Sequence, residues 1–334
     1  MSSLFRYSRW ASQFKKSPPI FTSFSTATTE AQPNRPSPPP IRVGLTDSVG
    51  RAVFATRRIG TGELIHTAKP IVAHPSLPSL HKVCYFCLRK LPNQKPHSEA
   101  HKNVAFCSEH CKDQSKNFYE IEKKADWSRF NEYCRLQGLK YPLLVKRFAC
   151  QVMSGVVSAD SLDILQPANL TSEMVSMMEK EFCLLRSTFQ ETDIKGEQMA
   201  SFQRAYILDL LVLTKEWYTG VLARMRINAF RIELPGGSYE DLLSSAAASI
   251  EAEIAVGSAV YMLPSFYNHD CDPNAHILWM ENVDARLKAL RNIEAGEELR
   301  ICYIDASMNH KARQTVLYEG FGFLCNCPRC LSND

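Results

Sequence analysis

Cysteine spacing places the tightest limit on how this chain can fold. Twelve cysteines occur in 334 residues, and Cys84-x-x-Cys87 is followed after 19 residues by Cys107-x-x-x-Cys111. Two such pairs joined by a loop can place four thiolates around one Zn²⁺, and tight pairs favour metal over disulfides in a reducing compartment. The spacing therefore predicts a zinc-binding segment. The alternative, four buried thiols, is disfavoured because polar residues surround both pairs.

A second metal site is predicted at the end of the chain. Cys325, Cys327 and Cys330 supply three thiolates and leave a tetrahedral zinc one ligand short. Cys271, which follows Asn268-His269, is the natural fourth ligand if that dipeptide belongs to the active centre; the alternative is a packed free thiol. The other cysteines lack such spacing and are expected to be small core residues: Cys134, Cys150, Cys183 and Cys302.

Charge and hydropathy exclude some classes of function. The formal net charge is +4, and residues 1–40, with five basic side chains and one acidic one, account for all of it. A neutral body argues against strong nonspecific nucleic-acid binding, which needs a basic footprint. The sequence contains no run of about 18 apolar residues, so no membrane span is expected. The apolar run from Ile207 to Leu213 is interrupted by Asp209 and is expected to be a buried helix.

The first 40 residues have the composition of a targeting segment. No acidic residue precedes Glu30, and Arg and Lys are mixed with Ser, Thr and aromatic residues. This is typical of a mitochondrial or plastid transit peptide; the alternative is an ordinary disordered tail. Pro33 to Pro40 is expected to be an extended linker. The folded part should begin near Ile41.

The remaining chain alternates between strand-like and helix-like stretches. Short β-like runs separated by glycines occupy residues 41–72, apolar residues at helical spacing dominate residues 114–229, and strand signals return from 257 to 303. This order predicts an α+β fold in which insertions split a β core.

Three motifs of different chemistry follow in order near the C-terminus. They read FYNHDCDPNAHI at 266–277, GEELRICYID at 296–305 and LCNCPRC at 324–330. Together they resemble the SET domain of protein lysine methyltransferases, of the SET-and-MYND-like class, and most closely the plant trithorax-related histone-lysine methyltransferases. The resemblance covers essentially all of residues 41–332.

That resemblance implies a SET β core of small sheets with a threaded active site, split by a zinc finger and a helical insert and closed by a zinc-binding tail. The implied domains are a leader and linker (1–40), the N-terminal SET part (41–83), a truncated MYND-like finger (84–111), a helical insert (112–235), the catalytic SET core (236–304) and a post-SET tail (305–334).

The resemblance further implies an S-adenosyl-L-methionine-dependent protein lysine methyltransferase. Tyr303 would be catalytic, because its hydroxyl can orient the lysine amine; the alternative is a strand tyrosine with a satisfied hydroxyl. The residues implied to hold the cofactor are Arg51, Ala52, Asn268, His269, Tyr303 and Phe323. For Phe323, adenine stacking competes with simple packing.

Departures from the family pattern carry their own expectations. Tyr119 and Lys123 stand where ligands of a second finger zinc would be expected, so one zinc is predicted there. Ala52 replaces the second glycine of a Gly-x-Gly motif, and Asp270 replaces a serine. Both favour a rival interpretation, a catalytically weak interaction module. A zinc-dependent nucleic-acid binder is a second rival, weakened by the lack of a basic recognition helix.

Some neighbouring residues are expected to be structural. Adjacent residues on a strand point to opposite faces, so Glu297 and Glu298 are not expected to share one site. Tyr267 is expected to be core, with a place in the lining of the lysine channel as the alternative. The expected substrate is a protein lysine, in the histone H3 tail or in a non-histone protein. The expected location is a mitochondrion or plastid, with the nucleus as the alternative.

Overall fold

The computed structural model describes residues 38–46, 50–92, 97–99, 104–194, 213–234 and 255–334. The predicted leader (1–37) and residues 207–212 of the expected buried helix lie outside these ranges. The fold described below is that of the compact unit Pro39–Asp334.

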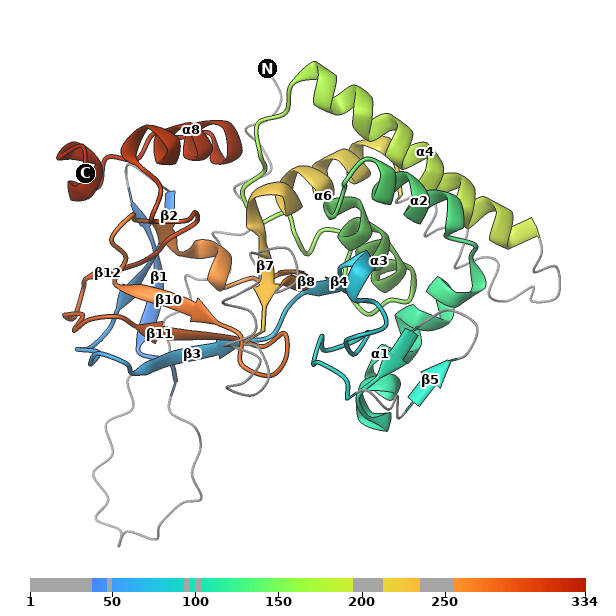
Figure 1. Ribbon diagram of the computed structural model, residues 1–334, viewed down its shortest axis with the longest axis horizontal. Helices are drawn as coiled ribbons and strands as arrows, with labels where there is room; N and C mark the ends of the chain where they lie inside the picture. The colour runs from blue at the N-terminus through green and yellow to red at the C-terminus, as the bar shows by residue number, and fades with distance from the viewer. Residues whose placement is uncertain (1–37, 47–49, 93–96, 100–103, 195–212, 235–254) are drawn as a thin grey trace, which may run out of the picture. The chain divides into compact units, whose positions relative to one another are not determined.

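Four small, mostly antiparallel sheets form the β part (Figure 1). The first has the order β1-β2-β12-β9, with bounds Ile41–Thr46, Gly50–Ala55, Glu298–Ile301 and Asn268–His269. The second has the order β10-β11-β3, with bounds Ala275–Leu278, Ala285–Ala289 and Leu64–Ala68. The third has the order β4-β8-β7, with bounds Val72–Pro75, Ala255–Val260 and Ala229–Glu233. The fourth is the hairpin of β5 and β6, His97–Glu99 and Val104–Phe106.

The first three sheets each combine strands from both ends of the folded unit. β2 pairs with β12, β3 with β11 and β4 with β8. The chain between β4 and β7 supplies the β5-β6 hairpin and most of the helices. This arrangement confirms the α+β class and the β core split by an insertion.

The helices between β4 and β7 gather on one side of that core (Figure 1). Their bounds are Glu109–Lys124 (α1), Ser128–Leu136 (α2), Tyr141–Met153 (α3), Ser172–Ile194 (α4) and Lys215–Asn228 (α6). Two C-terminal helices, α8 (His310–Phe321) and α9 (Pro328–Leu331), follow the last strand, and short 3₁₀ turns occupy Leu77–Ser79 and Pro264–Phe266. In the described part of the chain, no helix is both long enough and apolar enough to cross a membrane.

Helix α3 is the centre of the helical part. It is apolar on almost every side, as expected of a helix buried all round. Its two cations are also buried, because Glu122 of α1 pairs with Lys146 at 3.5 Å and with Arg147 at 3.1 Å. Arg147 also donates to the backbone oxygen of Tyr85 at 3.3 Å. This ion cluster ties the Cys84–Cys87 turn to α1 and α3.

Two details differ from the sequence-based expectations. Cys134 and Cys150 are fully buried as expected, but Cys183 is exposed on α4, so its assignment to the core was wrong. Cys84 is also fully buried and packs in the main core. The polar residues around the finger cysteines therefore did not predict the environment of Cys84, because the apolar partners come from elsewhere in the chain.

Candidate active site and metal centres

The motif strands lie side by side. β9, which is Asn268-His269, pairs in parallel with β12, with Asn268 opposite Arg300 and His269 opposite Ile301. The backbone N–H of Asp270 continues the pairing by donating to the carbonyl of Ile301 at 3.0 Å. The NHDC motif and the GEELRICY motif, about 30 residues apart in sequence, are thereby brought into one place.

The side chain of Asn268 is held by its amide hydrogens. Its Nδ2 donates to Glu298 Oε1 at 2.8 Å and to the backbone oxygen of Arg51 at 3.1 Å. Arg51 of β2, predicted to be near the cofactor, is therefore beside Asn268. Because both N–H groups are used, the carbonyl oxygen Oδ1 remains as the atom that can accept a hydrogen bond from a ligand.

His269 connects the tyrosine strand to the terminal cysteine cluster. The ring is 7% exposed, and its Nδ1 accepts from the backbone N–H of Tyr303 at 3.1 Å. Because Nδ1 is an acceptor, the proton of the neutral ring lies on Nε2, which is 3.3 Å from Cys271 Sγ. Burial lowers the pKa of His269 to about 4, although Asp270 acts in the opposite direction. The imidazole is thus neutral near pH 7.

Tyr303 follows β12 and packs in an aromatic group. Its ring lies 5.3 Å from that of His269 and 5.1 Å from that of Phe321, and Phe323 meets it edge-on at 6.4 Å. The hydroxyl donates to the backbone oxygen of Tyr267 at 2.6 Å. Burial, with a contribution from Glu298, raises the pKa of Tyr303 well above its usual range. The hydroxyl therefore stays protonated and can serve as a neutral hydrogen-bonding group.

Tyr267 is fully buried, which confirms its assignment to the core. Its hydroxyl lies 2.9 Å from His66 Nε2 on β3, a partner that the sequence did not suggest. Burial lowers the pKa of His66 to about 4, so this ring is also neutral near pH 7. No local signal could have found the pair, because the two residues are 201 positions apart.

Ala52 lies in the middle of β2 and is fully buried. Its neighbour Gly50 has φ of +77°, a conformation that favours glycine. The extra methyl group of Ala52 is thus enclosed by protein, while the backbone of Arg51 reaches Asn268.

The terminal cysteines converge as expected. The sulfur atoms of Cys271, Cys325, Cys327 and Cys330 all lie within 4.8 Å of one another. Cys271 Sγ is 4.0 Å from that of Cys325 and 3.5 Å from that of Cys330. Tetrahedral zinc with Zn–S bonds of about 2.3 Å needs sulfur atoms roughly 3.8 Å apart. The four thiols therefore fit zinc in both number and spacing.

A buried arginine accompanies this terminal cluster. Arg313 of α8 is fully buried, and its Nη2 lies 3.9 Å from Cys330 Sγ. The same guanidinium donates to the backbone oxygen of Met308 at 2.6 Å and to that of Asp334. Its positive charge suits a neighbouring group of thiolates, which carries net negative charge when it binds zinc.

The finger cysteines also form a compact set. The sulfur atoms of Cys84, Cys87, Cys107 and Cys111 lie within 4.8 Å of one another, with Cys107 at 3.6 Å from Cys87 and 3.4 Å from Cys111. They too fit one zinc ion. Tyr119, at a position where a further ligand was considered, instead packs against Tyr85 and Phe106.

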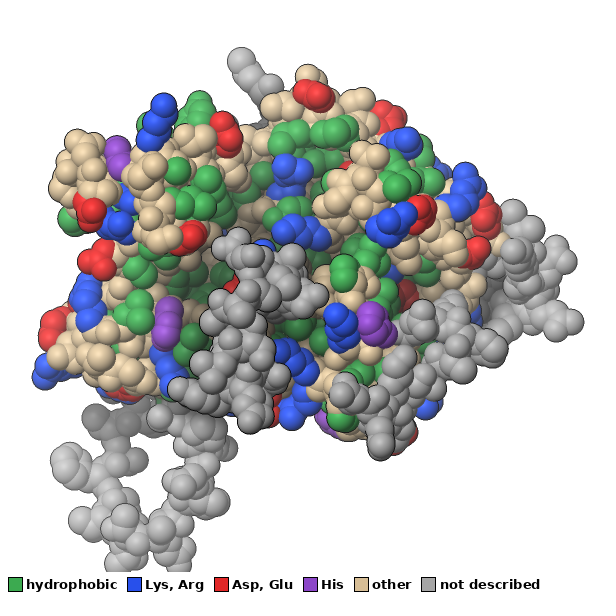
Figure 2. Space-filling model, in the orientation of Figure 1, with side chains coloured by type: hydrophobic (Ala, Val, Ile, Leu, Met, Phe, Trp, Pro, Cys, Tyr) green, Lys and Arg blue, Asp and Glu red, His purple; other side chains and the backbone are tan. Residues whose placement is uncertain are grey.

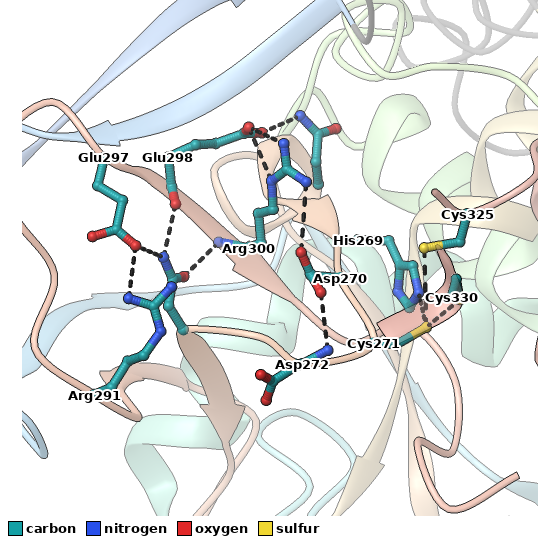
Figure 3. A network of polar contacts seen from close by, with 12 residues as sticks. His269, Asp270, Cys271, Asp272, Arg291, Glu297, Glu298, Arg300, Cys325 and Cys330 are labelled. Carbon is teal, nitrogen blue, oxygen red and sulfur yellow. Dashed lines mark hydrogen bonds and ion pairs between the residues drawn. The ribbon is translucent and has the colours of Figure 1, made fainter. Parts of the chain in front are cut away.

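Glu297 and Glu298 have different side-chain partners, as their adjacency on a strand predicted. Glu297 accepts from Asn274 at 3.0 Å and pairs with Arg291 at 2.8 Å. Glu298 instead pairs with Arg300 at 2.6 Å and accepts from Asn268 (Figure 3). The contact of Glu298 with Asn268 was missed, because it depends on the pairing of β9 with β12.

Cavity volume alone does not identify this candidate site. A hollow of about 890 Å³ is lined by residues of β4, β7 and β8 and the segment around Lys82, and none of the cofactor residues predicted above lines it. Its rim carries several basic side chains, among them Lys82, Lys140 and Arg231. The candidate site is defined by motif residues and their hydrogen bonds.

Comparison with known proteins agrees with the motifs. The chain is 57% identical to the histone-lysine N-methyltransferase ATXR4 of Arabidopsis thaliana, over 98% of each chain. It is 25% identical to a SET and MYND domain-containing protein of Dictyostelium discoideum, over 81% of this chain and 77% of that protein. It is 26% identical to the protein-lysine N-trimethyltransferase SMYD5 of Gallus gallus, over 86% of this chain and 85% of that one.

A solved structure, the SET domain of LSMT bound to lysine and AdoHcy, matches with a TM-score of 0.30 and 14% identity, over 86% of this chain and 53% of that chain. This similarity is too weak to bear on ligands here. The SET domain family model, in contrast, matches residues 50–304, which include β2, both motif strands and Tyr303. With paired motif strands, a nearly full-length relative and this match, the chain belongs to the SET domain family.

Proposed function

We propose that this protein transfers a methyl group from S-adenosyl-L-methionine to the ε-amine of a protein lysine. The observation that carries the proposal is the parallel pairing of β9 with β12, which brings Asn268, His269 and Tyr303 together. The named activity of the Arabidopsis relative, histone-lysine N-methyltransferase, supports it.

The cofactor residues follow from this geometry. Asn268 offers Oδ1 to the ammonium group of the cofactor. Arg51 and Ala52, on β2, contribute backbone next to Asn268, and His269 also contributes its backbone. We assign Phe323 to stack on adenine, which is supported by its ring lying 6.0 Å from that of His269. In this assignment Phe323 closes the site from the zinc-binding tail.

In the reaction, the lysine ammonium would first lose a proton to water. The neutral nitrogen would then attack the sulfonium methyl carbon, and the S–C bond would break as the N–C bond forms, giving S-adenosylhomocysteine and a methylated ammonium. The amine must be neutral, yet a free lysine of pKa about 10.4 is only roughly 0.1% neutral near pH 7.4. Burial and the sulfonium charge both lower that pKa. The neutral Tyr303 hydroxyl then orients the amine and contacts the methyl group.

The two cysteine clusters hold zinc in structural roles. Four thiolates per ion leave no open position for a reacting ligand, which distinguishes structural from catalytic zinc. Zinc at Cys271 supplies a fixed point for the tail, and His269 Nε2 donates to its thiolate.

The substrate is a lysine of a protein. A histone lysine, for which the H3 tail is our candidate, is favoured by the name of the Arabidopsis relative, whereas the composition of residues 1–40 favours a non-histone protein of a mitochondrion or plastid. We place the protein in such an organelle, with the nucleus as the alternative; a fusion with and without residues 1–40, imaged in cells, separates the two.

The first test is calorimetry on the zinc-loaded protein with S-adenosylhomocysteine, the demethylated cofactor. Binding is expected for the wild-type chain, and its absence in folded protein would overturn the proposal. Tyr303→Phe is expected to keep this binding and to lower turnover on a lysine peptide about 100-fold, as for loss of one fixed hydrogen-bonding group at a reacting centre. Unchanged turnover would remove Tyr303 from the chemistry.

A further inference from the structure

Asp270 departs from the serine expected at this motif position, and the structure provides it with a partner. The carboxylate lies 3.6 Å from Arg300 Nη1, on the neighbouring strand β12. Its other oxygen, Oδ1, accepts from the backbone N–H of Asp272 at 2.9 Å. The Asp270 side chain is only 13% exposed and that of Arg300 is 38% exposed, so the ion pair is partly shielded from water.

Arg300 also holds Glu298. Its Nε and Nη2 both donate to Glu298 Oε2, at 3.0 and 2.6 Å. Glu298 is 14% exposed and Arg300 is 38% exposed on their side chains. Figure 3 shows the guanidinium between the two carboxylates, with Asp270 on the side of His269 and Cys271.

The two oxygens of Glu298 face different partners. Oε2 takes the two Arg300 bonds, while Oε1 accepts from Asn268 Nδ2 at 2.8 Å. The orientation of the Asn268 amide therefore depends on a carboxylate whose own orientation is fixed by Arg300. If Glu298 turned away, the Asn268 amide would keep only its bond to the backbone oxygen of Arg51, and could then rotate and present N–H groups, instead of Oδ1, towards a cationic ligand.

We infer that Arg300 is a positioning residue for the methyl donor: held by Asp270, it fixes Glu298, and Glu298 in turn keeps the Asn268 carbonyl directed at the cofactor's ammonium group. The inference rests on the proposed function, because it takes Asn268 as a cofactor ligand. Arg300 touches neither the cofactor nor the reacting atoms in this role. Asp270 thereby has a function in the chain, as the anchor of Arg300.

The test measures S-adenosylhomocysteine affinity by calorimetry for Arg300→Met in the zinc-loaded protein. Affinity is expected to fall about tenfold, the size of one lost hydrogen bond to a charged group. In peptide methylation assays, KM for S-adenosyl-L-methionine should rise by a similar factor while kcat at saturation changes less than about twofold. Arg57→Met is the matched control, because Arg57 makes an equally short bond of 2.7 Å to Glu63 in an exposed pair.

A double-mutant cycle separates positioning from general structural support. In an Asn268→Ala background, Arg300→Met should weaken binding less than about twofold, because the group through which Arg300 acts is gone. Additive losses in the cycle would refute the inference. Asp270→Ser, which restores the family residue, is expected to weaken binding about two- to threefold, as for a single partly shielded ion pair.

Glu298→Gln gives a second route if Arg300→Met does not fold. The glutamine amide has the same size as the Glu298 carboxylate but only one oxygen, which accepts from Arg300. Its N–H₂ group then faces the N–H₂ group of Asn268, so the Asn268 amide has to flip. Affinity is expected to fall at least tenfold, as for the loss of a hydrogen bond to a charged group. If wild-type protein binds no S-adenosylhomocysteine, the proposed function fails; if it binds and these variants bind equally well, only the role of Arg300 fails.

Discussion

The two cysteine clusters offer the same ligands but are built into the molecule differently. The finger cluster takes its four cysteines from Cys84 to Cys111, within one short stretch, whereas the tail cluster joins Cys271 to residues up to 59 positions away. The finger is held by the buried ion cluster around Glu122, and the tail cluster touches His269, a residue of the proposed methyl-transfer site. The same four-cysteine ligand set can thus stabilise the finger segment in one case and the surroundings of His269 in the other.

The largest effect is expected from breaking the anchor of the finger. Glu122→Ala leaves Lys146 and Arg147 buried without their carboxylate, and the free energy of unfolding should fall by about 3–5 kcal/mol. Urea denaturation measures this. Glu120→Ala, which removes an exposed partner of Lys123 on the same helix, is the control and should cost less than about 1 kcal/mol.

The same anchor has a pH dependence. Burial alone raises the pKa of Glu122, but Arg147 and Lys146 outweigh it, so the net pKa in the folded protein is lowered. A lowered folded pKa adds stability above the unfolded value of about 4.3 and loses it as pH falls through the folded value. The difference in free energy of unfolding between wild type and Glu122→Ala should therefore become smaller below about pH 4. A difference that grows there would contradict this account.

The next effect separates the clusters directly. Cys271→Ser should reduce bound zinc by one ion and weaken S-adenosylhomocysteine binding about 100-fold, about 2.7 kcal/mol, because His269 loses its thiolate partner. Cys107→Ser should also reduce zinc by one ion, yet change cofactor binding less than about threefold. Metal analysis and calorimetry on folded protein measure both. Equal losses of binding would show that the clusters do not differ as described.

The smallest effect concerns the buried arginine of the tail. Arg313→Met removes a positive charge next to Cys330, and retention of the second zinc against a chelator should weaken about tenfold, within the range seen for outer partners of metal ligands. Lys311→Met, an exposed change on the same helix, should leave retention unaltered. If both variants hold zinc as well as wild type, the thiolates do not depend on Arg313.

The sequence predicted the parts of this molecule that depend on local spacing or on a recognised motif. The finger cysteines, the three tail cysteines and the strand runs agree with the structure, since each has a signal in short spacings along the chain. The fourth ligand, Cys271, was found because tetrahedral zinc requires it. The role of Tyr303 was inferred by resemblance and stays a prediction.

The parts that escaped prediction depend on contacts between distant segments. His66 meets Tyr267 across 201 positions, and Glu298 meets Asn268 only because β9 lies beside β12. Asp270 was interpreted as a sign of weakened function, because nothing in the sequence shows that Arg300 forms an ion pair with it. Cys183 was placed in the core because a cysteine without a metal partner is usually buried, yet it lies on the solvent side of α4.

The pairing of β2 with β12 has a consequence for synthesis in the cell. Strand β2 of the first sheet, Gly50–Ala55, is made well before its partner β12, Glu298–Ile301, which follows about 240 residues later. At roughly 5–20 residues per second, the nascent chain waits for tens of seconds or less with that edge unmatched. The helices between β4 and β7 can fold during this interval. The pairing of β12 with β2 then completes the first sheet after these helices have formed.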